Sequence, residues 1–152
     1  MRLVRRALGR REEDGSALVE VVWLSVLLLV PLLYVMLAAF EVQRAAYGVS
    51  GAARAAARAY SLAPDEGSAP ARARAAAAVA LEDQRIPTGE VALVVSCRPA
   101  PGNCLAPGSQ ISVDIRYQVP LPLTPRALGG GRPSVRVEAS HTVAYGSFRE
   151  DR

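Results

Sequence analysis

The sequence has no lysine, a single histidine and few aromatic residues. All 18 of its basic residues are arginines; five of them lie among the first eleven residues and the others are scattered. Aromatic residues make up only 5% of the chain. A nucleic-acid-binding protein usually gathers its basic residues into a stripe and interleaves them with aromatics. This composition therefore predicts that the protein has no nucleic-acid partner.

Catalytic and cofactor-binding motifs are also missing. The sequence contains neither a Gly-x-Ser-x-Gly nucleophile motif nor a His-Glu-x-x-His zinc motif. The run Gly129-Gly130-Gly131 lacks the Lys-Ser/Thr pair of a phosphate-binding loop, so we interpret it as a turn. The single His141 falls on the apolar register of the last predicted strand, where a partly buried histidine is expected. We predict no catalytic residues, no metal and no cofactor, and therefore no enzyme.

One long apolar segment, Val21 to Phe40, contains no charged residue. Twenty helical residues extend about 30 Å, which matches the hydrocarbon core of a bilayer. Pro31 lies in the middle, where it removes one backbone donor and is expected to bend the helix. Trp23 and Tyr34 are candidates for interfacial or packing aromatics. The segment predicts a transmembrane helix in contact with membrane lipid.

The flanks of this segment predict its orientation. The leader before it, Met1 to Asp14, is rich in arginine, whereas only Arg44 follows closely after it. Because cytoplasmic flanks hold the excess of positive charge, we expect the N-terminus in the cytoplasm and the C-terminal domain outside the cell membrane. A cleavable secretory signal is the main alternative: a cut near Ala39 would release a small secreted domain.

Helical character continues beyond the membrane segment. The stretch from Glu41 to Tyr60 is dominated by alanine, the strongest helix former. Its small residues share one face of a helical wheel: Ala45, Gly48, Ala52, Ala55, Ala56 and Ala59. The opposite face holds Gln43, Tyr47, Arg54 and Arg58. The small face could rest on the protein's own domain, or it could pack closely against another subunit. Both interpretations predict one helix from about Ser16 to Leu62.

The rest of the chain, residues 63–152, predicts a small extracytoplasmic domain. Ser68 is a candidate cap for a second short helix, with Pro70 in its first turn and an end near Gln84. The apolar period then changes to two, which predicts strands over residues 90–97, 110–119 and 134–145. The expected fold is α+β: a long N-terminal helix, a second helix and a small three-stranded antiparallel sheet.

Two cysteines, Cys97 and Cys104, bracket a short loop between the first two strands. Outside the cytoplasm a disulfide is permitted, and closing so short a loop contributes about 2.5 kcal/mol in the chain-entropy description. A metal site would need more ligands than these two cysteines and one histidine supply. The pair therefore predicts a structural disulfide.

A single carboxylate, Glu20, lies at the start of the apolar segment. Placed unpaired inside a bilayer, it would cost a few kcal/mol. It could be solvated at the headgroup level, or it could favour the positive end of the helix dipole. It could instead pair with a cation, most simply an amine of a neighbouring chain.

The residues around this carboxylate resemble a known signal. Gly15-Ser16-Ala17-Leu18-Val19-Glu20, followed by an apolar run, is similar to the class III signal of pilins and pseudopilins. The whole layout resembles the TadE-like proteins of the tight adherence (Flp pilus) system. The resemblance implies that a prepilin peptidase cuts between Gly15 and Ser16, which removes residues 1–15 as a cytoplasmic leader. Val21 stands where major Flp pilins carry tyrosine, and this favours a minor, pseudopilin-like component.

The resemblance also implies a mechanism and partners. Glu20 would neutralise the freed Ser16 amine of an adjacent subunit during assembly. The partners would be the peptidase, other pilins and pseudopilins, and the pilus assembly platform. The alternative is a generic single-pass anchored binding module, in which Gly15 and Glu20 have no special role.

Overall fold

The structure is a computed structural model that describes residues 10–122 and 133–148, with the backbone alone for residues 10–16. The leader up to residue 9 and the glycine-rich turn at residues 129–131 lie outside this part. The chain divides into two compact units, Met1–Ala39 and Phe40–Arg152. The second unit therefore includes the last part of the long helix, which the sequence grouped with the membrane segment.

The long helix α2 spans Arg10–Ser61. It passes through Pro31 without an interruption, so the loss of one backbone donor does not end it. It begins before the predicted start at Ser16, because the Arg and Glu residues of the leader are good helix formers. The Gly15–Ser16 peptide bond consequently lies inside the helix.

The second unit contains an antiparallel sheet of three strands in the order β1-β2-β3. The strands are β1 Ala92–Arg98, β2 Gln110–Pro120 and β3 Ser134–Ala144. Val113 in β2 lies opposite Val95 in β1 and His141 in β3. The three predicted strands are therefore confirmed to within two residues at each end, and the α+β fold class is confirmed with them.

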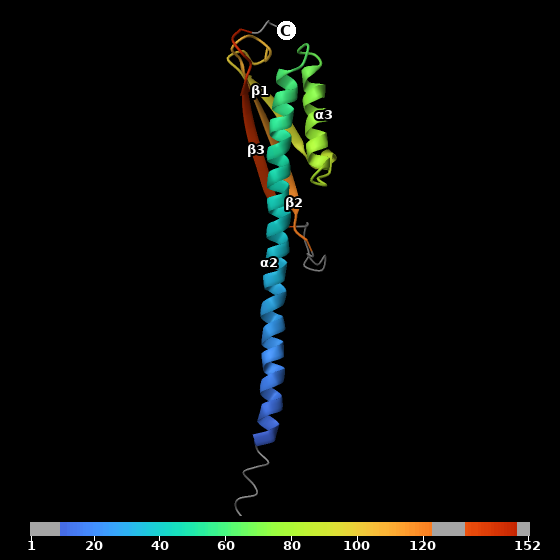
Figure 1. Cartoon of the computed structure of the whole chain (residues 1–152), viewed down its shortest axis with the longest axis vertical. Coiled ribbons are helices and arrows are strands. Elements are labelled where there is room, and N and C mark those ends of the chain that lie inside the picture. The colour runs from blue at the N-terminus through green and yellow to red at the C-terminus, as the bar shows by residue number, and fades with distance from the viewer. Residues whose placement is uncertain (1–9, 123–132, 149–152) are drawn as a thin grey trace, which may run out of the picture. The chain divides into compact units, whose positions relative to one another are not determined.

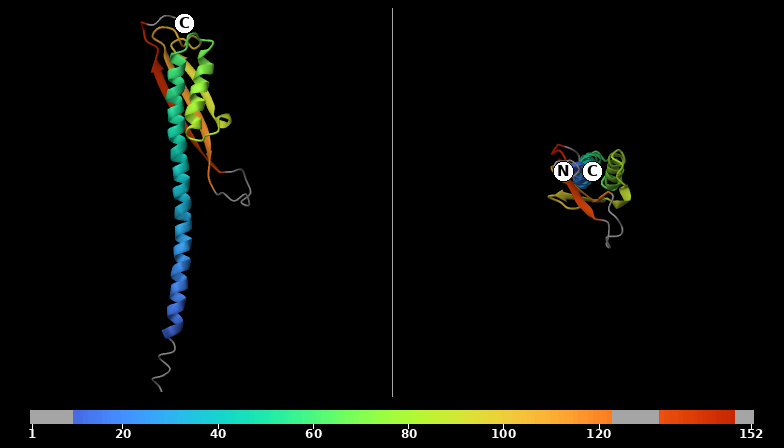
Figure 2. Two further views of the ribbon diagram at one scale, coloured as in Figure 1. Left: turned by 45° about the vertical axis from the view of Figure 1, so that its right-hand side comes forward. Right: turned by 90° about the horizontal axis from the view of Figure 1, so that it is seen from below.

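Two helices cover one face of this sheet. They are the part of α2 that follows Phe40 and the second helix, α3 (Ala69–Glu82). Figure 2, which adds a view along the long axis, shows the helices in one layer and the strands in the other. A short 3-10 helix, η1 (Thr88–Glu90), leads from α3 into β1. The unit is thus a two-layer α/β sandwich with one open face.

The core between the layers joins small helix residues to branched strand residues. The inward residues of β2 include Ile111, Val113 and Ile115, all fully buried. Opposite them lies a set of small residues on the two helices: Ala45, Val49, Ala52, Ala53, Ala56 and Ala57 of α2, and Ala69, Ala73 and Ala77 of α3. Small side chains let the backbones of the helices approach the sheet closely. The Ala-rich face of α2 therefore rests on its own domain at Ala45, Gly48, Ala52 and Ala56, whereas Ala55 and Ala59, predicted on the same face, are half-buried. The buried residues of this face are not available for packing against another subunit.

At the start of α3, the predicted capping role of Ser68 is wrong. Ser68 occupies the N-cap position but has helical dihedral angles and makes no side-chain cap hydrogen bond. Instead, the backbone N–H of Ser68 donates to Oδ1 of Asp65, at 2.8 Å. The hydrogen bonds from Ser68 hold the pKa of the Asp65 carboxyl below its ordinary value. Asp65 rather than Ser68 therefore orders the turn that begins α3.

The end of α3 is tied back to α2. Arg85 has a positive φ of 55°, and the N–H of Ile86 donates to the carbonyl of Leu81 at 2.9 Å, which closes the last turn. Arg44 of α2 donates to the carbonyl of Gln84. Ile86 is 3% exposed and packs over Gly48, where the absence of a side chain allows the close approach. Two contacts from α2 thus position the connection into β1.

Where α2 ends, a disulfide and a carboxylate join neighbouring segments of the second unit. Cys97 and Cys104 form the predicted disulfide, with Cα atoms 5.3 Å apart. Next to it, the N–H of Leu105 donates to Oε2 of Glu66 at 3.1 Å. The hydroxyl of Tyr60 donates to the other oxygen of Glu66 at 2.5 Å. Glu66 therefore joins the end of α2 to the disulfide loop.

Candidate membrane-spanning and processing segment

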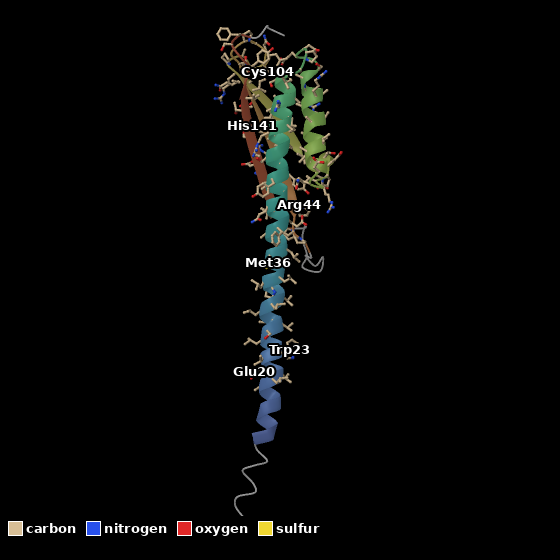
Figure 3. The ribbon with its side chains drawn as sticks, viewed as in Figure 1. Glu20, Trp23, Met36, Arg44, Cys104 and His141 are labelled. Carbon is tan, nitrogen blue, oxygen red and sulfur yellow. A yellow bond between two sulfur atoms is a disulfide. The ribbon has the colours of Figure 1, made fainter. Side chains whose placement is uncertain are left out.

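The apolar part of α2 exposes its side chains in the part of the chain that the structure describes. Between residues 17 and 40 almost every side chain is exposed, including Trp23 at 69% and Phe40 at 60%. Figure 3 shows Glu20, Trp23 and Met36 on this segment. By length and composition the helix is able to cross a membrane. An exposed apolar surface of this kind is unfavourable in water, so it requires an apolar environment or a partner.

The few polar groups of the segment can be followed individually. The hydroxyl of Ser25 donates to the carbonyl of Val21 at 2.7 Å, so it is satisfied within the helix. Pro31 has no N–H, so the carbonyl of Leu27 lacks its helical donor. Tyr34 is half-buried. In an apolar environment the carboxylate of Glu20 is therefore the group with the largest unmet requirement.

Glu20 is exposed, and it forms no ion pair with any side chain that the structure describes. Gly15 and Ser16 precede it in the same helix, where the structure describes the backbone alone. Ser16 is four residues before Glu20, which places both on one helix face about 6 Å apart along the axis. The Gly15–Ser16 bond lies within the first turns of α2, where glycine weakens the helix.

The second unit shows no arrangement for metal chemistry in its described residues. No group of three or more His, Cys, Asp or Glu side chains is placed there to hold an ion. Both cysteines are joined in the disulfide. His141 is half-buried on the inner face of β3, on the register that the sequence predicted. The absence of an enzyme activity remains a prediction.

One cationic feature escaped the sequence analysis. Arg54 and Arg58 were expected on the polar face of α2 and His141 on the apolar face of the last strand, and each expectation holds. Sequence patterns do not indicate which helix face meets which strand, so they could not reveal that these three side chains line one groove. Comparisons with protein-family models, with curated proteins and with solved structures found no match to this chain.

Proposed function

We propose that the protein is a single-pass membrane component of a tight adherence (Flp) pilus assembly system, related in design to TadE-like pseudopilins. The observation that supports this best is the continuity of α2. One helix contains the Gly15–Ser16 signal, the exposed apolar segment with its lone Glu20, and the face that packs on the sheet domain. The resemblance to TadE-like proteins rests on the signal and the single apolar segment, followed by an Ala-rich continuation of the same helix.

In this proposal the arginine-rich leader stays in the cytoplasm and the sheet domain lies outside the cell membrane. A prepilin peptidase removes residues 1–15, and the new N-terminus is the amine of Ser16. In an assembly of several chains, Glu20 of one chain accepts hydrogen bonds from that amine in the next. The pairing relieves the cost of a lone carboxylate in the membrane and fixes the register between neighbouring helices.

The partners of this mechanism are the peptidase, other pilins or pseudopilins and the assembly platform. Because the Ala-rich face of α2 is buried against the protein's own sheet, such partners cannot bind to it. Contacts outside the membrane would have to use other surfaces of the second unit, for example the exposed face of α2 at Gln43 and Tyr47, the latter 77% exposed. The apolar segment itself is free on all sides to pack with other helices.

The first test is the N-terminus of the protein recovered from membranes of cells with an active prepilin peptidase. We expect a mature chain that begins at Ser16. Gly15→Leu should abolish this product, because a bulky side chain blocks the cut, whereas Gly9→Leu, at the other glycine of the leader, should leave it unchanged. Intact-mass spectrometry distinguishes the two.

The same measurement separates the alternatives. An intact Met1 in wild-type cells would contradict the proposal and favour a generic anchored binding module. A soluble product that begins near Phe40 would indicate a secreted domain instead. That cut would fall at the boundary between the two units and would leave the sheet domain whole.

A second prediction concerns Glu20. Glu20→Gln should leave the cut at Ser16 in place but lower the association of chains several-fold, because a neutral amide cannot neutralise the amine. The association can be measured by co-purifying two differently tagged copies from detergent. Glu13→Gln, on the part of the leader that is removed, is the matched control. Equal co-purification of the Glu20→Gln variant and the wild type would show that charge pairing plays no part.

A further inference from the structure

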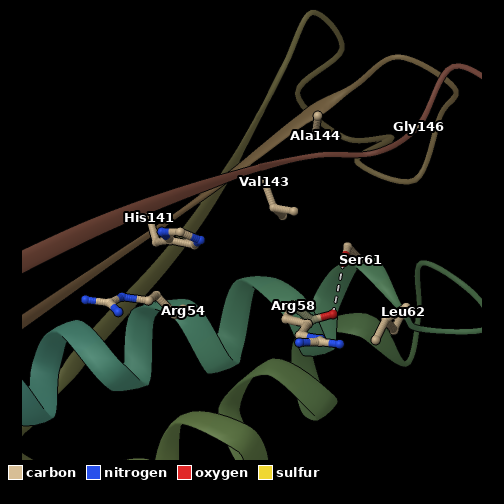
Figure 4. Close-up of a pocket in the computed structure, with 8 residues that line it drawn as sticks. All are labelled: Arg54, Arg58, Ser61, Leu62, His141, Val143, Ala144 and Gly146. Carbon is tan, nitrogen blue, oxygen red and sulfur yellow. Dashed lines mark hydrogen bonds between the residues drawn. The ribbon is translucent and has the colours of Figure 1, made fainter.

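A groove of about 600 Å³ lies within the second unit, between α2 and the inner face of β3. Figure 4 shows its two walls. Arg54 and Arg58 belong to α2, Leu62 directly follows its last residue, and His141, Val143 and Ala144 belong to β3. Its volume falls in the range of specific ligand sites.

The walls of this groove have an unbalanced charge. Three basic side chains line it, and no carboxylate is among the lining residues that the structure describes. Arg54 donates to the hydroxyl of Ser50 at 2.9 Å, which orients it without neutralising it. Arg54 and Arg58 are four residues apart on one helix, an arrangement in which like charges repel. The ion pairs of the described residues involve other arginines, Arg44 with Glu41 and Arg116 with Glu138. The groove therefore offers cationic donors to an external anion.

The strand beside the groove is an edge of the sheet. β3 pairs with β2 on one side, and no other described strand pairs with it. Along such an edge, every second residue directs its backbone N–H and carbonyl outward. An open edge is the surface to which extended peptides add as a further strand. Here the open edge of β3 borders the cationic groove, so a ligand could form backbone hydrogen bonds to β3 and ion pairs with the arginines at the same time.

The spacing of the two arginines fits an extended ligand. Four residues of α2 separate Arg54 from Arg58, a rise of about 6 Å. Side chains two residues apart on a strand lie about 7 Å apart on the same face. α2 and β3 run alongside each other (Figure 1). A strand added to β3 could therefore present carboxylates at alternate positions to the two arginines.

We propose that this groove binds an acidic segment of a partner protein in extended conformation, which adds to the open edge of β3 and pairs alternate carboxylates with Arg54 and Arg58. Val143 and Leu62 provide apolar contact for the stems of the acidic side chains. The proposal does not depend on membrane insertion or on the cut at Gly15. The experiment below can therefore contradict peptide binding in the groove without contradicting the proposed role in pilus assembly, and the reverse.

The test uses the full chain in uncharged detergent micelles and a fluorescent peptide of three Glu-Thr repeats, with binding followed by anisotropy. The matched peptide has Gln in place of Glu. Arg54→Gln with Arg58→Gln should weaken binding of the Glu peptide at least about tenfold. The control pair is Arg72→Gln with Arg136→Gln, which removes the same charge from exposed positions outside the groove. It should change binding less than about twofold.

Two further peptides test the addition of a strand. One is N-methylated at its Glu residues and the other at its Thr residues. Only one edge of an added strand bonds to β3, so one peptide should lose binding and the other should retain it. The proposal is overturned if the two double variants weaken binding equally, if Glu and Gln peptides bind alike, or if both N-methylated peptides bind like the parent. Competition by millimolar inorganic phosphate as effective as that by the unlabelled peptide would also overturn it, because a small anion would then suffice.

Discussion

Gly48→Leu should lower the free energy of unfolding of the sheet domain by about 3 kcal/mol, the upper part of the range for overpacking a core. A Cβ atom at this position would lie 2.5 Å from Cδ1 of Ile86 and 3.0 Å from Cβ of Gln84. Ile86 is buried and held by the turn that ends α3, so it cannot move aside without loosening that turn. The substitution separates α3 and its connection to β1 from α2.

The matched control is Gly51→Leu, one turn later in the same helix. A Cβ atom at Gly51 meets nothing within 4 Å. Leucine is a better helix former than glycine, so this variant should be neutral or more stable by up to about 1 kcal/mol. Thermal unfolding of the full chain in detergent, followed by near-ultraviolet circular dichroism of the buried tyrosines, measures both. Equal losses at Gly48 and Gly51 would show that the contact with Ile86 does not matter.

Glu66→Ala should destabilise the same domain by about 3 kcal/mol. The carboxylate accepts from the Tyr60 hydroxyl and from the Leu105 backbone, and hydrogen bonds to a charged group contribute about 1.5–3 kcal/mol each. Removing it leaves two donors without their acceptor beside the disulfide. Glu66→Gln keeps one acceptor and should lose about half as much. The unfolding experiment used for Gly48 measures both variants, and a loss below about 0.5 kcal/mol for Glu66→Ala would contradict this role.

The same contact predicts a dependence on alkaline pH. Burial and the hydrogen bond to Glu66 raise the pKa of the Tyr60 hydroxyl above its ordinary value. A group whose pKa is higher in the folded state stabilises the fold below its unfolded pKa, about 10, and loses this contribution as the pH rises further. The wild type should therefore lose more stability above pH 10 than Tyr60→Phe does. Parallel pH curves for the two proteins would show that Tyr60 makes no such contribution.

Much of the sheet domain could be predicted from sequence because its signals are local. In β2 the apolar residues Ile111, Val113 and Ile115 alternate with polar ones, and this period alone specifies a strand with one buried face. The disulfide followed from two cysteines close in sequence. The apolar segment followed from a run of twenty uncharged residues. In each case the physical cause lies within a few residues of its effect.

The contacts that hold the layers together could not be predicted in this way. Glu66 meets Leu105 across 39 residues, and Arg44 meets Gln84 across 40. The residues next to Glu66 and Arg44 in the sequence form no pattern that would predict these distant hydrogen-bond partners. The capping role of Asp65 was also missed, because Ser68 occupies the position that usually caps a helix. The sequence placed Gly48 on the small face of α2 but did not show that Ile86 would cover it.

The processing site could be predicted only through a resemblance. In the proposed function, Gly15, Ser16 and Glu20 form a signal that a peptidase and a neighbouring chain would recognise. A peptidase and a neighbouring chain are separate molecules, so neither the composition nor the periodicity of this sequence indicates their action. The N-terminal mass of the membrane protein tests the cut at Gly15–Ser16, and the Glu20→Gln variant tests the pairing between chains.

The alanine composition of the α2 face has a consequence for biosynthesis. This part of the helix is translated before the three strands that later cover it, and domains fold as their segments become available. An alanine exposes much less apolar area than a leucine or phenylalanine, so the uncovered face attracts other chains only weakly. The same residues favour the helix before any tertiary contact forms. The nascent helix can therefore remain folded, with little tendency to aggregate, until its sheet has been translated and covers it.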